Sequence, residues 1–229
     1  MRLFFLFAPL CFSLQLHAQF ALVEDKDGHV NVRDKPSLSA AITDRVPAGG
    51  IVFCMETEGE WYYVDYGTGK QPGSGYIHRS RLKMVQGFPE VPVHKTAGDS
   101  LVFQHDSLRL VLRKGPFRQE SRRLQYSRNE GFEFVTHIDG RDFWGTDGGV
   151  PREEYSAFRP SWKGRPVNMP DSAFNDVFEP NFYHTQLRYD GAGGRWFLEA
   201  FNSDGAGGYV VLWMFERNMY KGRQLFYGF

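Results

Sequence analysis

The chain closes with YDGAGGRWFLEAFNSDGAGGYVVLWMFERNMYKGRQLFYGF, residues 189–229, in which the pentapeptide DGAGG starts at Asp190 and again at Asp204. Apolar, aromatic segments follow each copy, at 196–201 and 209–215. Asp-Gly and Gly-Gly supply the positive φ angles that tight hairpin turns need, and aromatic and β-branched runs favour strands. The stretch therefore predicts a meander of antiparallel strands joined by glycine turns.

The composition of the whole chain favours an all-β protein. It has 25 glycines and 21 phenylalanines in 229 residues, of which 41% are hydrophobic. This content is sufficient for a small core and a medium one, so we expect two domains. The 27 basic and 27 acidic residues cancel, which gives no general attraction to nucleic acid.

The first 18 residues have the features of a secretory signal peptide. Arg2 precedes a short apolar run at 3–14, and Ala18 is a small residue before a cleavage site at Gln19. The run is shorter than the about 20 apolar residues that a membrane helix needs, as is every later one. We therefore expect an exported protein, periplasmic or extracellular, without a transmembrane segment. A lipid anchor on Cys11 is disfavoured because the two residues before it are not small.

Cys54 is the one cysteine that remains after residue 18, and it lies in the apolar run 51–55. An intramolecular disulfide is therefore excluded in the processed chain. We interpret Cys54 as a small buried hydrophobic residue. A catalytic thiol would need a neighbouring cation or a helix N-terminus, and the local sequence offers neither.

Residues 19–85 predict a small all-β module. Turn residues separate short apolar segments, which gives expected strands at 21–24, 29–33, 51–56, 61–66 and 75–78. The succession HVNVR, KPS, VPAG, EGEWYYV and GYIH, which begins at His29 and is closed by Leu82, resembles the bacterial SH3-like domain family. The resemblance implies a small barrel that binds cell-wall peptides or other proteins. Two departures are Tyr76, where the family often has Trp, and a long Gly- and Pro-rich turn at 67–74.

Strand alternation gives this module a candidate binding face. Trp61, Tyr63 and Asp65 share one face of a strand, and Val64 marks the opposite face as the core side. With Tyr76, the first three residues form a candidate platform for an extended peptide or a sugar ring. In the alternative interpretation, Trp61 and Tyr63 only seal the barrel against a neighbour.

Residues 86–98 carry spaced prolines and are expected to form an extended linker. A second β domain, a sandwich or a barrel-like sheet, then spans 99–229. It is expected to contain at most one short helix, at 171–178, with Asp171 as its N-cap. Its expected strands before the meander are 100–104, 107–112, 122–126, 132–138, 142–144, 155–162 and 182–189.

The succession DGR, FWGTDGG, FEPN, NSDGAGGY and YGF, between residues 139 and 229, resembles a domain of small secreted proteins from Bacteroidota-type bacteria. The resemblance implies a fold unit and an exported protein, and it implies no reaction.

Acidic and aromatic residues mark the turns of this second domain. If the turns of Asp147, Asp190 and Asp204 meet, Trp144 and Tyr209 would add an aromatic rim suited to a carbohydrate or a peptide. Purely structural turns are the competing interpretation. Calcium loops carry several oxygen ligands at close spacing, whereas each of these aspartates stands alone, so we expect no metal and no cofactor.

These observations predict a non-enzymatic exported protein of the cell envelope. Its expected partner is a cell-wall peptide, a peptidoglycan fragment or another envelope protein, and not nucleic acid. One alternative is an envelope hydrolase that acts on glycan or peptide through Asp147 and Asp204. A second alternative is a structural subunit of a surface assembly.

Overall fold

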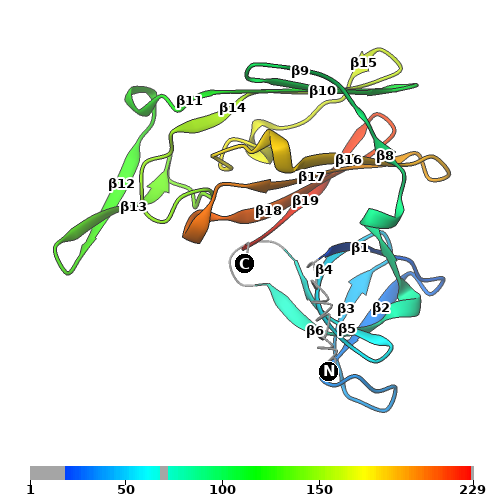
Figure 1. Ribbon diagram of the computed structural model, residues 1–229. Helices are drawn as coiled ribbons and strands as arrows, with labels where there is room; N and C mark the ends of the chain where they lie inside the picture. Colours follow the sequence, from blue (N-terminus) through cyan, green and yellow to red (C-terminus); the bar gives the residue numbers. More distant parts are fainter. Residues whose placement is uncertain (1–18, 68–71, 228–229) are drawn as a thin grey trace, which may run out of the picture.

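The structure is a computed structural model that describes residues 19–67 and 72–227, and it confirms an all-β protein (Figure 1). The expected signal peptide, residues 1–18, lies outside the described residues. In the described residues no helix is long and apolar enough to cross a membrane. The short helical turns are all of the 3₁₀ type: η1 (Arg79–Arg81), η2 (Val85–Gly87), η3 (Gln119–Ser121), η4 (Asp171–Ala173), η5 (Phe182–His184) and η6 (Gly205–Gly207).

The N-terminal strands form one seven-stranded antiparallel sheet in the order β3-β2-β6-β5-β4-β1-β7. Val30, Val52, Val64 and Ile77 are buried in a common cluster on one face of this sheet. The SH3-like barrel expected from the sequence is therefore present. Its strands are β1 (Gln19–Val23), β2 (His29–Arg33), β3 (Ile42–Pro47), β4 (Ile51–Glu58), β5 (Trp61–Tyr66), β6 (Gly73–His78) and β7 (Leu82–Met84).

The C-terminal part is a sandwich of two five-stranded sheets. The first sheet has the order β15 (Arg165–Pro166), β14 (Glu153–Trp162), β11 (Leu108–Pro116), β10 (Ser100–His105) and β9 (Val93–Ala97). The second has the order β19 (Met219–Tyr227), β18 (Tyr209–Glu216), β17 (Arg195–Asn202), β16 (Thr185–Asp190) and β8 (Glu90–Val91). Strands β16 to β19 pair consecutively and antiparallel, which confirms the predicted meander.

The sandwich core lies between the two sheets. Leu110 from the first sheet shares a buried cluster with Trp196 and Trp213 from the second. The ring of Trp196 also stacks on Phe215, with centroids 4.1 Å apart. Large aromatic side chains therefore supply much of the buried apolar surface that holds the two layers together.

The second sheet is also covered on its outer face, where the barrel packs (Figure 1). Phe20 and Phe53 of the barrel lie in one buried cluster with Phe197, Leu212 and Phe226 of the second sheet. The rings of Phe53 and Phe226 are stacked at 4.8 Å. Barrel and sandwich therefore share an apolar interface.

The segment expected as a linker, residues 86–98, is extended, but it belongs to both sheets. It supplies the edge strand β8 to the second sheet and the edge strand β9 to the first. Arg188 Nη1 donates to the carbonyls of Gln86 and Phe88 at 3.2 and 3.1 Å. These bonds tie the connection to the second sheet.

Several local expectations for the sandwich are wrong. The expected helix 171–178 is only the 3₁₀ turn η4, and Asp171 is its first residue rather than its N-cap. The expected strand 142–144 is reduced to a single bridge, between Trp144 and Val177. A separate hairpin of β12 (Leu124–Asn129) and β13 (Phe132–Ile138) projects from the sandwich (Figure 1).

Candidate functional site

The outer face of β4, β5 and β6 carries two neighbouring tyrosines. Strand register places Glu56, Tyr63 and Tyr76 side by side across the three strands. The two tyrosine rings meet edge to face, with centroids 5.1 Å apart. Tyr63 Oη donates to Ser74 Oγ at 2.9 Å, and Tyr76 Oη donates to Glu58 Oε2 at 3.4 Å. We call Tyr63 and Tyr76 the tyrosine pair.

Trp61 does not extend this platform as the sequence led us to expect. Its side chain is buried, at 9% exposure, and its ring meets His78 edge to face at 5.2 Å. Val64 is fully buried in the barrel core, which confirms the predicted core side of β5. The open aromatic surface of β5 and β6 therefore consists of the half-buried tyrosine pair.

Carboxylates surround the tyrosine pair. Glu56 and Glu58 are exposed on β4, and Asp65 is half-buried on β5. Partial burial raises the pKa of the Asp65 carboxyl. Partial burial and the Glu58 carboxylate raise the pKa of the Tyr76 hydroxyl. This face thus combines two aromatic rings with negative charge and is suited to an amphipathic, positively charged ligand.

Asp190 has a structural partner and lies apart from the other turn aspartates. Its carboxylate is buried and accepts from Arg195 Nη2 at 2.5 Å and from Nε at 2.8 Å. Burial alone would raise the pKa of Asp190, but the Arg195 guanidinium and the Gly193 amide lower it below its ordinary value. Arg195 Nη2 also contacts Glu24 of the barrel at 2.9 Å. Asp190 therefore fixes a turn beside the barrel.

Asp147 and Asp204 do come together, and both are exposed. They line one surface hollow of about 410 Å³ between the turns 145–150 and 203–207. Asp190 is absent from this hollow because successive turns of a meander lie at opposite ends of the sheet. In the described residues there is no group of three or more His, Cys, Asp or Glu side chains arranged to hold a metal.

Trp144 and Tyr209 are core residues rather than an aromatic rim. Trp144 is 8% exposed and Tyr209 is fully buried. Tyr209 Oη donates to the Phe178 carbonyl at 2.8 Å and accepts from Asn202 Nδ2 at 3.0 Å. The sequence expectation is wrong because the alternation of β18 points Tyr209 into the sandwich.

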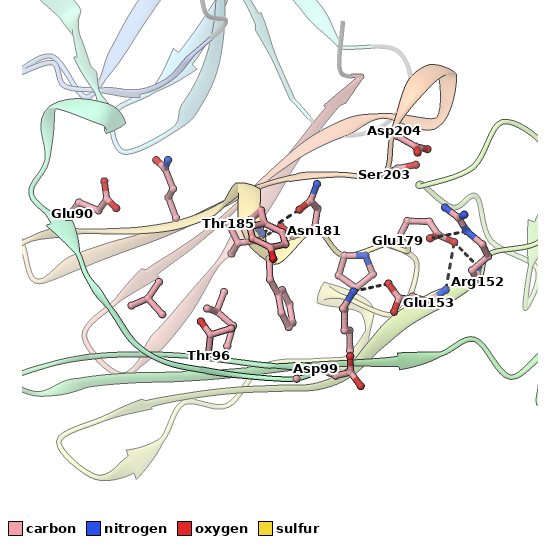
Figure 2. A pocket seen from close by; sticks show the side chains of 18 residues that line it. Glu90, Thr96, Asp99, Arg152, Glu153, Glu179, Asn181, Thr185, Ser203 and Asp204 are labelled. Atoms are coloured by element: carbon pink, nitrogen blue, oxygen red, sulfur yellow. Dashed lines mark hydrogen bonds and ion pairs between the residues drawn. The ribbon is translucent and has the colours of Figure 1, made fainter.

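A larger groove opens at one side of the sandwich, and of the site residues predicted from the sequence Asp204 lines it (Figure 2). Its volume is about 800 Å³. Figure 2 shows Glu90 and Asp204 toward opposite ends of the groove, with Thr96 and Asp99 on one side and Asn181 on the other. Tyr183 also lines the groove and is 97% exposed. The sequence signal for this groove is the aromatic pair Phe182-Tyr183 after Pro180-Asn181, which lies in the turn η5 and not in a strand that begins at residue 182.

Cys54 is not placed for nucleophilic chemistry. Its side chain is buried in the barrel core, and burial raises the pKa of the thiol to about 12. The thiol therefore stays protonated near neutral pH, as expected of a small core residue.

Comparison with protein families gives a match to the N-terminal barrel. The model described as the bacterial SH3 domain matches residues 28–83, which run from the residue before β2 into β7. The comparisons with curated proteins and with solved structures found no match. The match supports the barrel resemblance, and the resemblance of the C-terminal part to a Bacteroidota domain stays a prediction.

Proposed function

We propose that this chain is an exported binding protein of the bacterial cell envelope, whose SH3 barrel holds a cell-wall peptide on the tyrosine pair. The observation that carries the proposal is the position of Tyr63 and Tyr76 on an open face of a barrel that matches the bacterial SH3 model. Such barrels are binding modules. Aromatic rings with polar tips offer contact area and hydrogen bonding to an extended chain.

The negative charge beside the tyrosine pair favours a positively charged ligand. Glu56 and Glu58 lie on β4, which pairs with β5, and Asp65 lies on β5 two residues after Tyr63. A peptide that carries a free amine beside an apolar side chain would place its charge near these carboxylates and its carbon chain on the rings. Such attraction between exposed charges weakens as salt is added. Wall peptides with a diamino acid have this chemistry.

The sandwich leaves this face of the barrel available. It covers the outer face of β1 and of the first half of β4, where Phe20 and Phe53 are buried, and Glu56 to Glu58 in the second half of β4 are exposed. Tyr63 and Tyr76 lie outside that buried cluster. The sandwich therefore orients the barrel while the tyrosine pair remains open to a ligand.

Co-sedimentation with insoluble peptidoglycan tests the proposal. We expect saturable binding of the purified protein that decreases with salt and is weakened about tenfold or more in a Tyr63→Ala, Tyr76→Ala variant. Tyr126→Ala is the matched control, because Tyr126 is 46% exposed on the projecting hairpin. Binding that is undiminished in the double variant would contradict the proposal.

The same incubation separates the binding protein from an envelope hydrolase. Asp147 and Asp204 share a hollow, so they remain the first carboxylates to test for hydrolysis. Mass spectrometry of the supernatant is expected to find no released wall fragments. Fragments released by the wild type but not by Asp147→Asn, Asp204→Asn would replace the binding proposal with hydrolysis. Co-purification of a stable partner would instead favour a structural subunit.

A further inference from the structure

The groove of the sandwich has the dimensions of a ligand site. Its volume of about 800 Å³ lies within the range of roughly 300–1,000 Å³ that is usual for small-ligand sites. Its lining comes from both sheets and from the turn η5 (Figure 2). The residues that line it all belong to the segment 90–204, so the groove is separate from the tyrosine pair of the barrel.

Tyr183 is held on the rim of this groove by a well-anchored turn. Asn181 Oδ1 accepts from the Tyr183 amide at 3.1 Å, and Thr185 Oγ1 donates to the Asn181 carbonyl at 2.7 Å. The Asn181 amide in turn donates at 2.9 Å to Asn202 Oδ1, which is fully buried. The turn is therefore fixed to the core while it presents a 97% exposed aromatic ring. The backbone position of the ring is therefore preorganised for stacking, which reduces the part of the entropic cost of binding that comes from ordering the turn.

The cations of the groove are already paired. Lys114 Nζ contacts Glu153 Oε2 at 2.8 Å and lies 6.0 Å from the centre of the Phe182 ring. Arg152 Nε lies 3.5 Å from Glu179 Oε2, which is buried. An anionic ligand would have to compete with these carboxylates for the two cations.

Two carboxylates of the groove have no such partner. The side chains of Asp99 and Asp204 are exposed, and no residue that the structure describes forms a hydrogen bond or ion pair with either. Ionised carboxylates only accept hydrogen bonds. They are therefore suited to a ligand that brings several donors and no negative charge.

We propose that this groove binds a neutral oligosaccharide. A pyranose ring has an apolar face that stacks on an aromatic side chain such as Tyr183, and its hydroxyl groups donate to carboxylates such as Asp99 and Asp204. A neutral polyol needs no free cation, whereas the paired Lys114 and Arg152 disfavour an acidic glycan. This site is independent of the peptide site on the barrel.

Titration calorimetry of the purified protein with three neutral trisaccharides, N-acetylchitotriose, cellotriose and maltotriose, tests the assignment. We expect saturable binding of at least one of them and at least about tenfold weaker binding of the same sugar to Tyr183→Ala. Asp204→Asn is expected to weaken it as well, because the amide replaces one acceptor with a donor. Tyr126→Ala and Tyr63→Ala are expected to bind as the wild type does.

Because Tyr183 is almost fully exposed, its replacement is expected to leave the midpoint of thermal unfolding unchanged. Thermal unfolding of the variant checks that any loss of binding is local. Absence of binding to all three sugars, or equal binding by Tyr183→Ala, would overturn the assignment. Sugar binding by Tyr63→Ala at the wild-type affinity would show that the groove does not depend on the tyrosine pair. The results for the groove and for the barrel can then be judged separately.

Discussion

Glu199 is a carboxyl in the region where the connecting segment meets the outer face of the second sheet. Gln86 Nε2 donates to its two oxygens at 3.2 and 3.5 Å. Burial raises the pKa of Glu199 to about 7, against the opposing effect of the Arg188 guanidinium. Between about pH 4.5 and pH 7, the Glu199 carboxyl is therefore protonated in the folded protein and ionised in the unfolded chain.

This raised pKa predicts a stability that falls with pH. Between the ordinary value of 4.5 and about 7, the unfolded chain binds fewer protons at this site than the folded protein, so the free energy of unfolding decreases as pH rises. Glu199→Gln is expected to be more stable than the wild type by on the order of 1–3 kcal/mol at about pH 8, with little difference near pH 4.

Denaturant titrations of both proteins across this pH range measure the effect. Glu133→Gln is a suitable control, because the Glu133 side chain is 55% exposed. An equal pH dependence in Glu199→Gln and the wild type would show that the Glu199 carboxyl is ionised in the folded protein.

Among the secondary-structure elements, the meander was predictable and its geometry was not. Alternating apolar residues and Asp-Gly turns identified the strands around the two DGAGG copies. The copies lie at opposite ends of β17, so Asp190 and Asp204 belong to different surroundings. Strand β3 was missed because only Val46 of its six residues is buried, which leaves almost no apolar alternation.

The helix expected at 171–178 was overridden by tertiary hydrogen bonds. The Ala173 carbonyl accepts from Trp213 Nε1 at 2.7 Å and from Arg223 Nη1 at 3.0 Å. The Asp176 carboxylate is paired with the same arginine. These donors lie on strands about 40 or more residues further along the chain. The sequence of residues 171–178 alone therefore cannot predict these hydrogen bonds.

The turn of Trp144 to Val150 depends on a glycine. Gly145 has φ +118°, and a Cβ there would lie 2.7 Å from the Phe178 carbonyl oxygen. Gly145→Ala is therefore expected to lower the free energy of unfolding by on the order of 1–3 kcal/mol. Gly149→Ala in the same turn meets nothing within 4 Å and serves as the control. Equal stability of the two variants, measured by chemical denaturation, would contradict the strain at Gly145.

At the scale of the whole molecule, the two-domain division was predicted but the contact between the parts was not. Strands β1 and β4 contain FALV at 20–23 and IVFC at 51–54, which are apolar on both faces. Such continuous runs indicate strands that are buried on both sides. One face of each run lies in the barrel core, and the other packs on the second sheet.

This shared interface predicts cooperative unfolding of barrel and sandwich. Phe226→Ala removes the ring that stacks on Phe53, and we expect a loss of about 3–5 kcal/mol and a broader or split thermal transition. Differential scanning calorimetry measures both effects. Phe132→Ala, at a residue 78% exposed on the hairpin, is expected to leave a single transition at the wild-type temperature. Two separate transitions in the wild type would show that the parts unfold independently.

The most direct test of the central claim is calorimetric titration of the purified protein with a soluble cell-wall peptide that carries a free amine. The account predicts saturable binding that is weakened about tenfold or more by Tyr63→Ala and by Tyr76→Ala, and unchanged by Tyr126→Ala. No heat of binding with the wild type, or equal affinity in the tyrosine-pair variants, would contradict the claim that this face of the barrel holds the wall peptide.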